Sequence, residues 1–528
     1  MKSNIFFNRE NWLLFFLFLF SLLINQYYGN KGIFPIDGFG NFDAGFRILL
    51  GEHPFKDYWV NTGPIIDYIQ ATFFYLFGIS WQTYVLHASI LNAILTITTF
   101  IVLRKFKLNI FYSFLYSLFF SILAYPSSGT PFVDHHSAFF SLLGVYFLIL
   151  SVKEEKKIYF ILFPLLFGIA FLSKQTPAAY IILFSIIILI LYSIALKNFF
   201  WIKYSLISSL LFIFFLFTFG IINGINLNLF LDQYLFFPKS IGEQRFENLS
   251  FSFRGVIDHF KFIYLSFLPI FYINIKNIFL KKNYFKEKEF LYFLILFTFF
   301  ISLLFHQLLT KNQTFIFFLI PILTAFSQIS LSFDKTRLNS FLCLTILLIC
   351  LFATIKYHQR YNQDRKFHEL SYVDFSLSDD AGKIDDKLSG LKWITPDFKE
   401  NPAYEISLIN ETKVHLKNDK RKKMLMTNYS FFSIILNEKL YYPGRWYSPD
   451  GTTHPLKGNK YFDSYKNLLI KLIKENKIDV IYIVNSEKNL NITDNSIYDY
   501  INKECFEKTT INNLLTSFEL KNCNEING

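Results

Sequence analysis

The residues with the most evident chemistry in this sequence lie in one loop, PIDGFGNFDAGFRILLGEHPFKDYWVNTGP, at positions 35–64. Asp37, Asp43 and Asp57 stand there with Arg47 and several glycines. A carboxylate can take a proton from a hydroxyl or an amine, so Asp37 is a candidate general base. The alternative is that Asp37 caps the next helix, whose first turn stabilises an anion. Asp43 precedes Arg47 by four residues, a spacing that predicts an ion pair on one helix face.

A second acidic position occurs in the segment TPFVDHH, where Asp134 is followed by His135 and His136. Asp134 is a candidate second catalytic carboxylate, and its alternative is a helix cap. A divalent ion such as Mg²⁺ or Mn²⁺, held by Asp134 and His135, is a further hypothesis; otherwise no cofactor is expected. Adjacent helical residues point about 100° apart, so we do not expect both histidines to hold one ion.

Cations in other segments are candidates for binding an anion. Lys174 and Gln175 stand in the short connection between two apolar runs, Arg245 lies in a long polar segment, and Lys311 precedes another apolar run. A cation at the edge of apolar segments pairs with an anion or extends to a polar headgroup. The alternative for each of these residues, taken singly, is a solvated surface charge.

The elements that must position these residues are apolar helices. The 528 residues are 52% hydrophobic, 20% aromatic and only 17% charged, which is outside the range of an ordinary soluble domain. Most apolar runs are close to the length of about 20 residues that a helix needs to cross a bilayer. The sequence therefore predicts an α-helical polytopic membrane protein. About eleven spans are expected, at 11–28, 83–103, 109–124, 134–152, 157–172, 175–196, 201–223, 260–280, 289–308, 313–332 and 337–355.

The gaps between these runs alternate in charge. Short basic gaps such as 104–107, 153–157 and 281–289 place the N-terminus and these gaps in the cytoplasm under the positive-inside rule. The net charge of +12 is thus a sign of topology. The remaining gaps, which carry all the candidate residues, are expected outside, as is the tail. Residues 64–80 are apolar but contain Pro64, Asp67 and Gln70, a pattern typical of an interfacial helix.

The tail differs in composition, so we expect a membrane domain at 1–356 and a soluble α/β domain at 357–528. Segments 422–428 and 477–485 have the pattern of strands, and 462–476 that of a helix between them. Strand, helix and strand predict a parallel pair. Cys505 and Cys523 can form a disulfide if the tail faces an oxidising compartment.

The order of these features resembles the integral-membrane glycosyltransferases of the GT-C fold. The segments that carry the resemblance are AGFRILLGEHPFKDYWVNTGPIIDYIQATFFYLFG in the first outer loop, the Lys-Gln pair after the fifth span, and KNQTFIFFLIP before the tenth. The most similar branch comprises the protein mannosyltransferases of glycosyltransferase family 39 and the bacterial aminoarabinose transferase-like proteins. The resemblance covers the membrane portion, about two thirds of the chain.

The resemblance implies transfer of a hexosyl or pentosyl group from a polyprenyl-phosphate donor to a lipid, glycan or protein acceptor. The reaction would occur with inversion at the outer face of the bacterial cytoplasmic membrane. Asp37 takes the position of the catalytic carboxylate, with Asp43 as its rival, and Asp134 that of a second outer acidic residue. Lys174 takes the position of a cation that binds the carrier phosphate. The substrate-binding candidates are then Arg47, Asp57, Lys174, Gln175, Arg245 and Lys311, with Lys311 standing where relatives have an Arg-Tyr type pair.

The main alternative is a polytopic transporter or flippase of lipid-linked glycans. Transporters often show internal repeats, charges in the middle of spans and paired broken helices. This sequence shows no obvious repeat, few charges within spans, and polar groups gathered on one side. That distribution favours an enzyme that works at one membrane face. Because Lys and Arg fall largely in short gaps between apolar runs, no nucleic-acid partner is expected.

Overall fold

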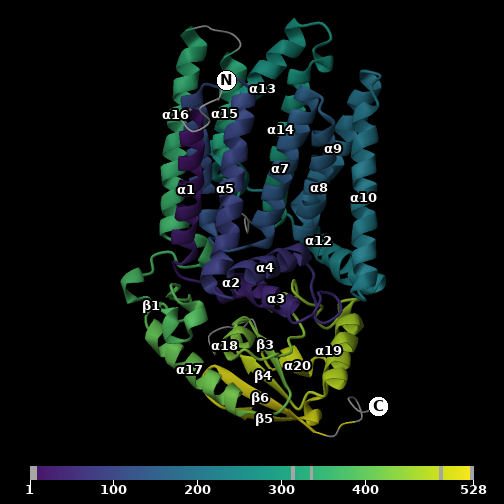
Figure 1. Cartoon of the computed structure of the whole chain (residues 1–528), viewed down its shortest axis with the longest axis vertical. Helices are drawn as coiled ribbons and strands as arrows, with labels where there is room; N and C mark the ends of the chain where they lie inside the picture. The colour runs from purple at the N-terminus through teal and green to yellow at the C-terminus, as the bar shows by residue number, and fades with distance from the viewer. Residues whose placement is uncertain (1–8, 311–314, 333–336, 487–491, 522, 524–528) are drawn as a thin grey trace, which may run out of the picture.

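A bundle of apolar helices, with a smaller α/β domain at one end, makes up the fold (Figure 1). The computed structural model describes residues 9–310, 315–332, 337–486, 492–521 and 523. Each of the eleven predicted apolar runs contains a helix. The helices are α1 (Arg9–Gly29), α5 (Trp81–Lys105), α6 (Ile110–Leu123), α7 (Val133–Glu154), α8 (Lys157–Ser173), α9 (Gln175–Ala195), α10 (Phe200–Ile222), α13 (His259–Leu280), α14 (Lys288–Leu309), α15 (Leu319–Ser332) and α16 (Arg337–Tyr357).

Nine spans among the described residues are long and apolar enough to cross a membrane, and α8 and α15 are shorter apolar helices. The tenth predicted run begins at 313, but its helix begins only at Leu319. Pro321 lies in the first turn of α15, where a missing backbone N–H removes no helical hydrogen bond. The prediction of a polytopic helical membrane protein is confirmed.

The helices differ in how much of their surface is covered by protein. Nearly every side chain of α7 is buried, whereas α10 buries only Trp201 and Ser208 and lies at one edge of the bundle (Figure 1). Exposed side chains of α10 such as Phe214 and Phe215 are large and apolar. A helix that is apolar on all sides and exposed needs lipid around it.

Ion pairs connect the basic gaps at the end of the bundle that lies away from the α/β domain. Arg104 pairs with Glu10 at 3.0 Å and Lys288 with Glu155 at 2.8 Å, while Lys105 pairs with Glu154. These contacts bring the N-terminal end of α1 together with three of the gaps that the sequence predicts to be cytoplasmic.

The first predicted outer loop folds between the bundle and the α/β domain (Figure 1). It forms α2 (Pro35–Gly38), α3 (Gly40–Leu49) and α4 (Pro64–Phe77). Helix α4 occupies the segment that has the pattern of an interfacial helix, and it lies across the end of the bundle. Further short helices, α11 (Leu227–Phe230) and α12 (Phe237–Glu247), form in the long gap after α10.

The α/β domain has a four-stranded sheet in the order β3-β4-β6-β5. Strands β3 (Lys423–Thr427) and β4 (Val480–Val484) are parallel, and α19 (Phe462–Asn476) connects them, as the sequence predicts. Alternate residues of β4 face opposite layers: Val480 and Tyr482 pack toward α17 (Pro402–Asn418), and Ile481 packs toward α19. The sequence did not predict the antiparallel additions, β5 (Phe506–Thr510) and β6 (Leu515–Leu520).

Smaller elements complete this domain. Cys505 and Cys523 form a disulfide, the pairing that the sequence allows. The remaining elements are β1 (Asp379–Asp380) and β2 (Lys392–Trp393), which pair antiparallel, with α18 (Phe432–Leu436) and α20 (Asn495–Tyr498).

The positive-inside rule predicts that the α/β domain lies outside the cell. A cysteine introduced at Val414, a residue that is 57% exposed on α17, should react with a membrane-impermeant maleimide in intact cells. A cysteine at Lys156, whose side chain is 59% exposed at the other end of the bundle, should react only after permeabilisation. The unsubstituted protein gives the background, and the reverse labelling pattern would place the domain in the cytoplasm.

Candidate functional site

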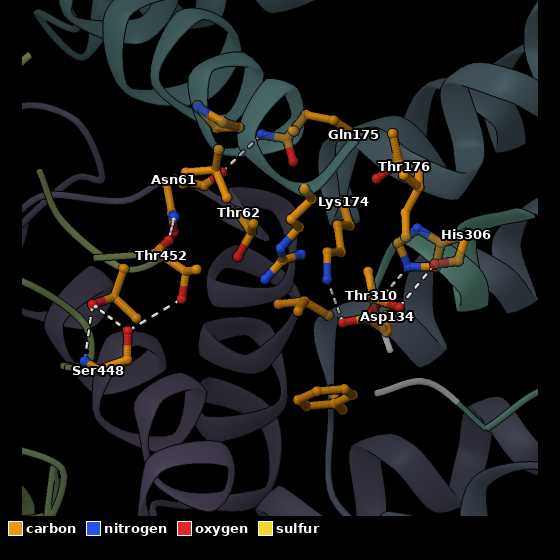
Figure 2. A pocket seen from close by; sticks show the side chains of 18 of the residues that line it. Asn61, Thr62, Asp134, Lys174, Gln175, Thr176, His306, Thr310, Ser448 and Thr452 are labelled. Carbon is orange, nitrogen blue, oxygen red and sulfur yellow. Dashed lines mark hydrogen bonds and ion pairs between the residues drawn. The ribbon is translucent and has the colours of Figure 1, made fainter. Parts of the chain in front are cut away.

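A cavity of about 1220 Å³ lies where the end of the bundle meets the α/β domain. Its walls come from the first loop, the start of α7, the junction of α8 with α9, α12, the end of α14, and the chain after α16. The α/β domain supplies the remaining wall through the loop 446–453. Figure 2 shows Asn61, Thr62, Ser448 and Thr452 on one side of this cavity, and Asp134, Lys174 and His306 on the other.

Asp134 accepts two charged or polar contacts at this cavity. Its Oδ2 lies 2.6 Å from Lys174 Nζ, and its Oδ1 lies 3.0 Å from His306 Nε2 (Figure 2). The Asp134 side chain is 4% exposed and that of His306 1%. A buried carboxylate needs such partners, because desolvation of an unpaired charge is costly. The structure thus joins Asp134 to Lys174, two residues that the sequence marked separately.

Each member of this cluster comes from a helix end. Asp134 lies in the first turn of α7, but Phe132 occupies the N-cap and no side chain caps the helix, so the cap hypothesis for Asp134 is wrong. Lys174 ends α8 and precedes α9, with extended backbone. His306 lies in the last turn of α14.

Asp37 lies in α2 at the wall of the same cavity. The hypothesis that it caps the next helix is wrong: Phe39 is the N-cap of α3, and no side chain caps it. The pKa of Asp37 is raised to about 7, first by burial and then by the carboxylates of Asp134 and Glu369, while Lys174 lowers it. Such a carboxyl group can exchange a proton near neutral pH.

Three other loop residues predicted for the site do not line the cavity. Arg47 pairs with Glu52 at 2.5 Å, so the predicted Asp43–Arg47 ion pair is wrong. The chain turns back after α3, and the N–H of Glu52 donates to the carbonyl of Arg47, which brings the two side chains together. Asp43 is 3% exposed, and burial raises its pKa to about 8. The Asp57 carboxylate accepts the N–H of His53 at 2.8 Å and so holds the turn.

Two of the three remaining predicted residues, Gln175 and Arg245, line the cavity. Gln175 lines the cavity and donates to the carbonyl oxygens of Asn61 and Tyr234, at 2.7 and 2.5 Å. Arg245, on α12, also lines it. Lys311 lies outside the described residues.

The His135 side chain hydrogen-bonds to a residue outside the cluster of Asp134, Lys174 and His306. Its Nε2 lies 3.1 Å from Ser127 Oγ, whereas Asp134 contacts Lys174 and His306. Successive helical side chains diverge, which explains why the two neighbours face different partners. Across the described ranges, no three His, Cys, Asp or Glu residues gather in a way that could hold a metal ion.

Sequence reasoning missed several residues of the cavity. His306 falls within the expected span 289–308, although a histidine in the last turn of that helix was a usable signal. Trp446, in the segment YPGRW, also lines the cavity, and the turn-forming residues around it gave no sign of this. Arg360, Lys366 and Glu369, which follow α16, also line it, and no local pattern indicated this.

Comparison with solved structures adds a structural similarity. No protein-family model matches the sequence, and no curated protein matches it. Among solved structures, the chain is similar to that described as "Crystal Structure of ArnT from Cupriavidus metallidurans bound to Undecaprenyl phosphate". The identity is 10% and the TM-score 0.48, over 97% of this chain and 98% of that chain. A similarity of this extent assigns no residue role and no substrate.

The contact between Asp134 and Lys174 makes a prediction for stability. Asp134→Asn should lower the free energy of unfolding by about 3 kcal/mol, because a largely buried ammonium loses its counter-charge. The double variant Asp134→Asn/Lys174→Met should lose less. Thermal unfolding in detergent, followed by intrinsic fluorescence, measures both. Asp258→Asn, which removes the half-exposed pair with Lys261, is the control, and an equal loss in Asp134→Asn and this control would contradict the prediction.

Proposed function

We propose that this protein is a glycosyltransferase that moves a sugar from a polyprenyl-phosphate donor to an acceptor at the outer face of the membrane. The observation that carries the proposal is that Asp37, with its raised pKa, shares one cavity at the end of the bundle with Lys174 and Arg245. A proton acceptor and cations around one space suit a reaction in which a hydroxyl is activated and a phosphate departs. The resemblance of the sequence to GT-C glycosyltransferases supports the same reaction.

In the proposed reaction, Asp37 acts as the general base. The acceptor oxygen forms a bond to the anomeric carbon of the donor, and its proton passes to the Asp37 carboxylate. The bond between the anomeric carbon and the phosphate oxygen breaks, and the electron pair stays on the lipid phosphate. Attack from the face opposite the phosphate inverts the anomeric centre.

Lys174 and Arg245 would stabilise the charge that develops on the departing phosphate. A Lys ammonium has three N–H donors, and Asp134 accepts from Lys174 at 2.6 Å. The other donors can therefore serve a phosphate oxygen. Asp134 and His306 act as positioning residues in this scheme, because they fix the ammonium against the cavity wall. Preorganised cations contribute most where water is excluded.

Asp37→Asn should remove the base and lower the rate of sugar transfer by roughly 100-fold to 10,000-fold. In the unsubstituted enzyme the rate should rise with pH and level off above about 7, because only the ionised carboxylate of Asp37 accepts the proton. Transfer by purified protein, assayed across pH with polyprenyl-phosphate sugars, measures both effects. Glu507→Gln, on the exposed face of β5, is the control. Wild-type transfer by Asp37→Asn would rule out Asp37 as the base.

Lys174→Met should lower kcat/KM for the donor by about 10-fold to 100-fold, because a charge-assisted hydrogen bond to the phosphate is lost. The rising limb of the pH profile should also move to higher pH, since Lys174 lowers the pKa of Asp37. Unchanged donor kinetics would remove Lys174 from the phosphate site.

The same assay separates transfer from lipid transport. Detergent-solubilised protein has no two compartments, so a flippase would give no glycosylated product there, whereas a transferase would. Absence of product with every polyprenyl-phosphate sugar offered would contradict the proposed function.

A further inference from the structure

Arg445 extends from the α/β domain into the folded first loop. Its side chain is 2% exposed, and its Nη2 lies 2.5 Å from Oδ2 of Asp67, which is fully buried in α4. Its Nη1 donates to the carbonyl oxygen of Thr62 at 2.8 Å and to Asn41 Oδ1 at 3.2 Å. Tyr58 donates its hydroxyl to the same Asp67 oxygen at 3.0 Å. One guanidinium therefore holds three segments of the first loop.

The residues that Arg445 contacts either line the cavity or are bonded to segments that line it. Thr62 lines the cavity, as does Trp446, whose ring centroid lies 4.9 Å from the Arg445 guanidinium carbon. Asn41 donates its amide N–H to the carbonyl oxygen of Pro131 at 3.1 Å, three residues before Asp134. The guanidinium thus joins the first loop, the approach to α7 and the α/β domain.

Gly63 shows how closely these parts approach one another. Its φ is +68°, and a Cβ added there would lie 2.6 Å from Cγ1 of Val133 and 3.0 Å from Nη1 of Arg445. Only glycine is tolerated in such a position, because both the backbone conformation and the space exclude a side chain. The absence of a side chain at Gly63 thus leaves space for the Arg445 guanidinium beside the cavity wall.

We propose that Arg445 is a positioning residue of the active site: the α/β domain uses it to fix the walls of the cavity, so the site is complete only when that domain is docked. The inference rests on the proposed function. A buried ion pair adds little net stability compared with apolar residues of similar volume, because desolvation offsets the attraction. The planar fork of arginine can bind a carboxylate, a carbonyl and an amide oxygen together, which a lysine ammonium on one flexible stem cannot reproduce. The geometry therefore favours control of shape over stability alone.

The decisive variant is the neutral pair Asp67→Asn/Arg445→Met, which leaves no unpaired buried charge. We expect the variant to stay folded in detergent, with its melting temperature lowered only by the hydrogen bonds that Thr62 and Asn41 lose, while kcat for transfer falls by roughly 100-fold, as small displacements in an active site can cause. The donor KM should change little, because Arg445 does not line the cavity and Lys174 and Arg245 remain. A purely structural role would leave kcat unchanged once the fold is restored.

A matched control removes a buried cation of the same domain that lies away from the cavity. The side chain of Lys423, in β3, is 2% exposed and pairs with Glu438 at 2.8 Å. Lys423→Met/Glu438→Gln should retain the kcat of the unsubstituted protein. If the neutral Asp67/Arg445 variant is folded and has wild-type kcat, the proposal is overturned.

The variant Arg445→Lys keeps a charge beside Asp67 and provides a second test if the neutral pair does not fold. Hydrogen–deuterium exchange of the full-length protein should become faster in residues 61–67 and 446–453, and kcat should fall. Unchanged exchange together with unchanged kcat would overturn the proposal. If the unsubstituted protein transfers no sugar at all, the proposed function fails. Hydrogen–deuterium exchange of Arg445→Lys still tests whether Arg445 fixes these walls. Faster exchange than in the unsubstituted protein supports that role, and unchanged exchange refutes it.

Discussion

The charge of Asp134 at the start of a buried helix constrains the arrangement of the end of the bundle that meets the α/β domain. A carboxylate that is 4% exposed must be compensated, and the partners come from two other places in the bundle: Lys174 at the junction of α8 with α9, and His306 at the end of α14. Three parts of the bundle must therefore meet at one point. The cavity forms at that point, with an ammonium already held at its wall.

The α/β domain packs on this polar end of the bundle, and buried arginines bind backbone carbonyl groups across the contact. Arg365 is fully buried and donates to the carbonyl oxygens of Pro126 and Ser128 at 2.8 and 3.0 Å. Arg47 contributes in the opposite direction, from the first loop to the carbonyl of Tyr442 at 3.2 Å. Together with Arg445, these contacts satisfy loop carbonyls that would otherwise be buried without a donor. The same contacts that hold the domain against the bundle therefore also hold walls of the cavity.

The distribution of charge within the cavity is consistent with a site that holds both the proposed base and cations. Asp37 lies in a wall where burial and the carboxylates of Asp134 and Glu369 oppose its ionisation, while Lys174 favours it. The balance places the pKa of Asp37 near neutrality, where a carboxyl group can both hold and release a proton. A base with an ordinary carboxylate pKa would be weaker in this role.

The sequence by itself determined the elements that local physics controls. Long apolar runs specify helices of membrane length, and the alternation of basic gaps predicts their orientation across the bilayer. The pattern of the tail likewise specified β3, α19 and β4 with their parallel pairing. It also marked Asp37, Asp134 and Lys174 as candidate catalytic or binding residues, because charged groups beside apolar helices are conspicuous.

Only the tertiary structure decided which charged side chains meet. Arg47 binds Glu52 instead of Asp43, and Arg445 binds Asp67, which is 378 positions away in the sequence. Such pairings depend on how helix ends and loops pack in three dimensions, and no periodicity of the sequence carries that information.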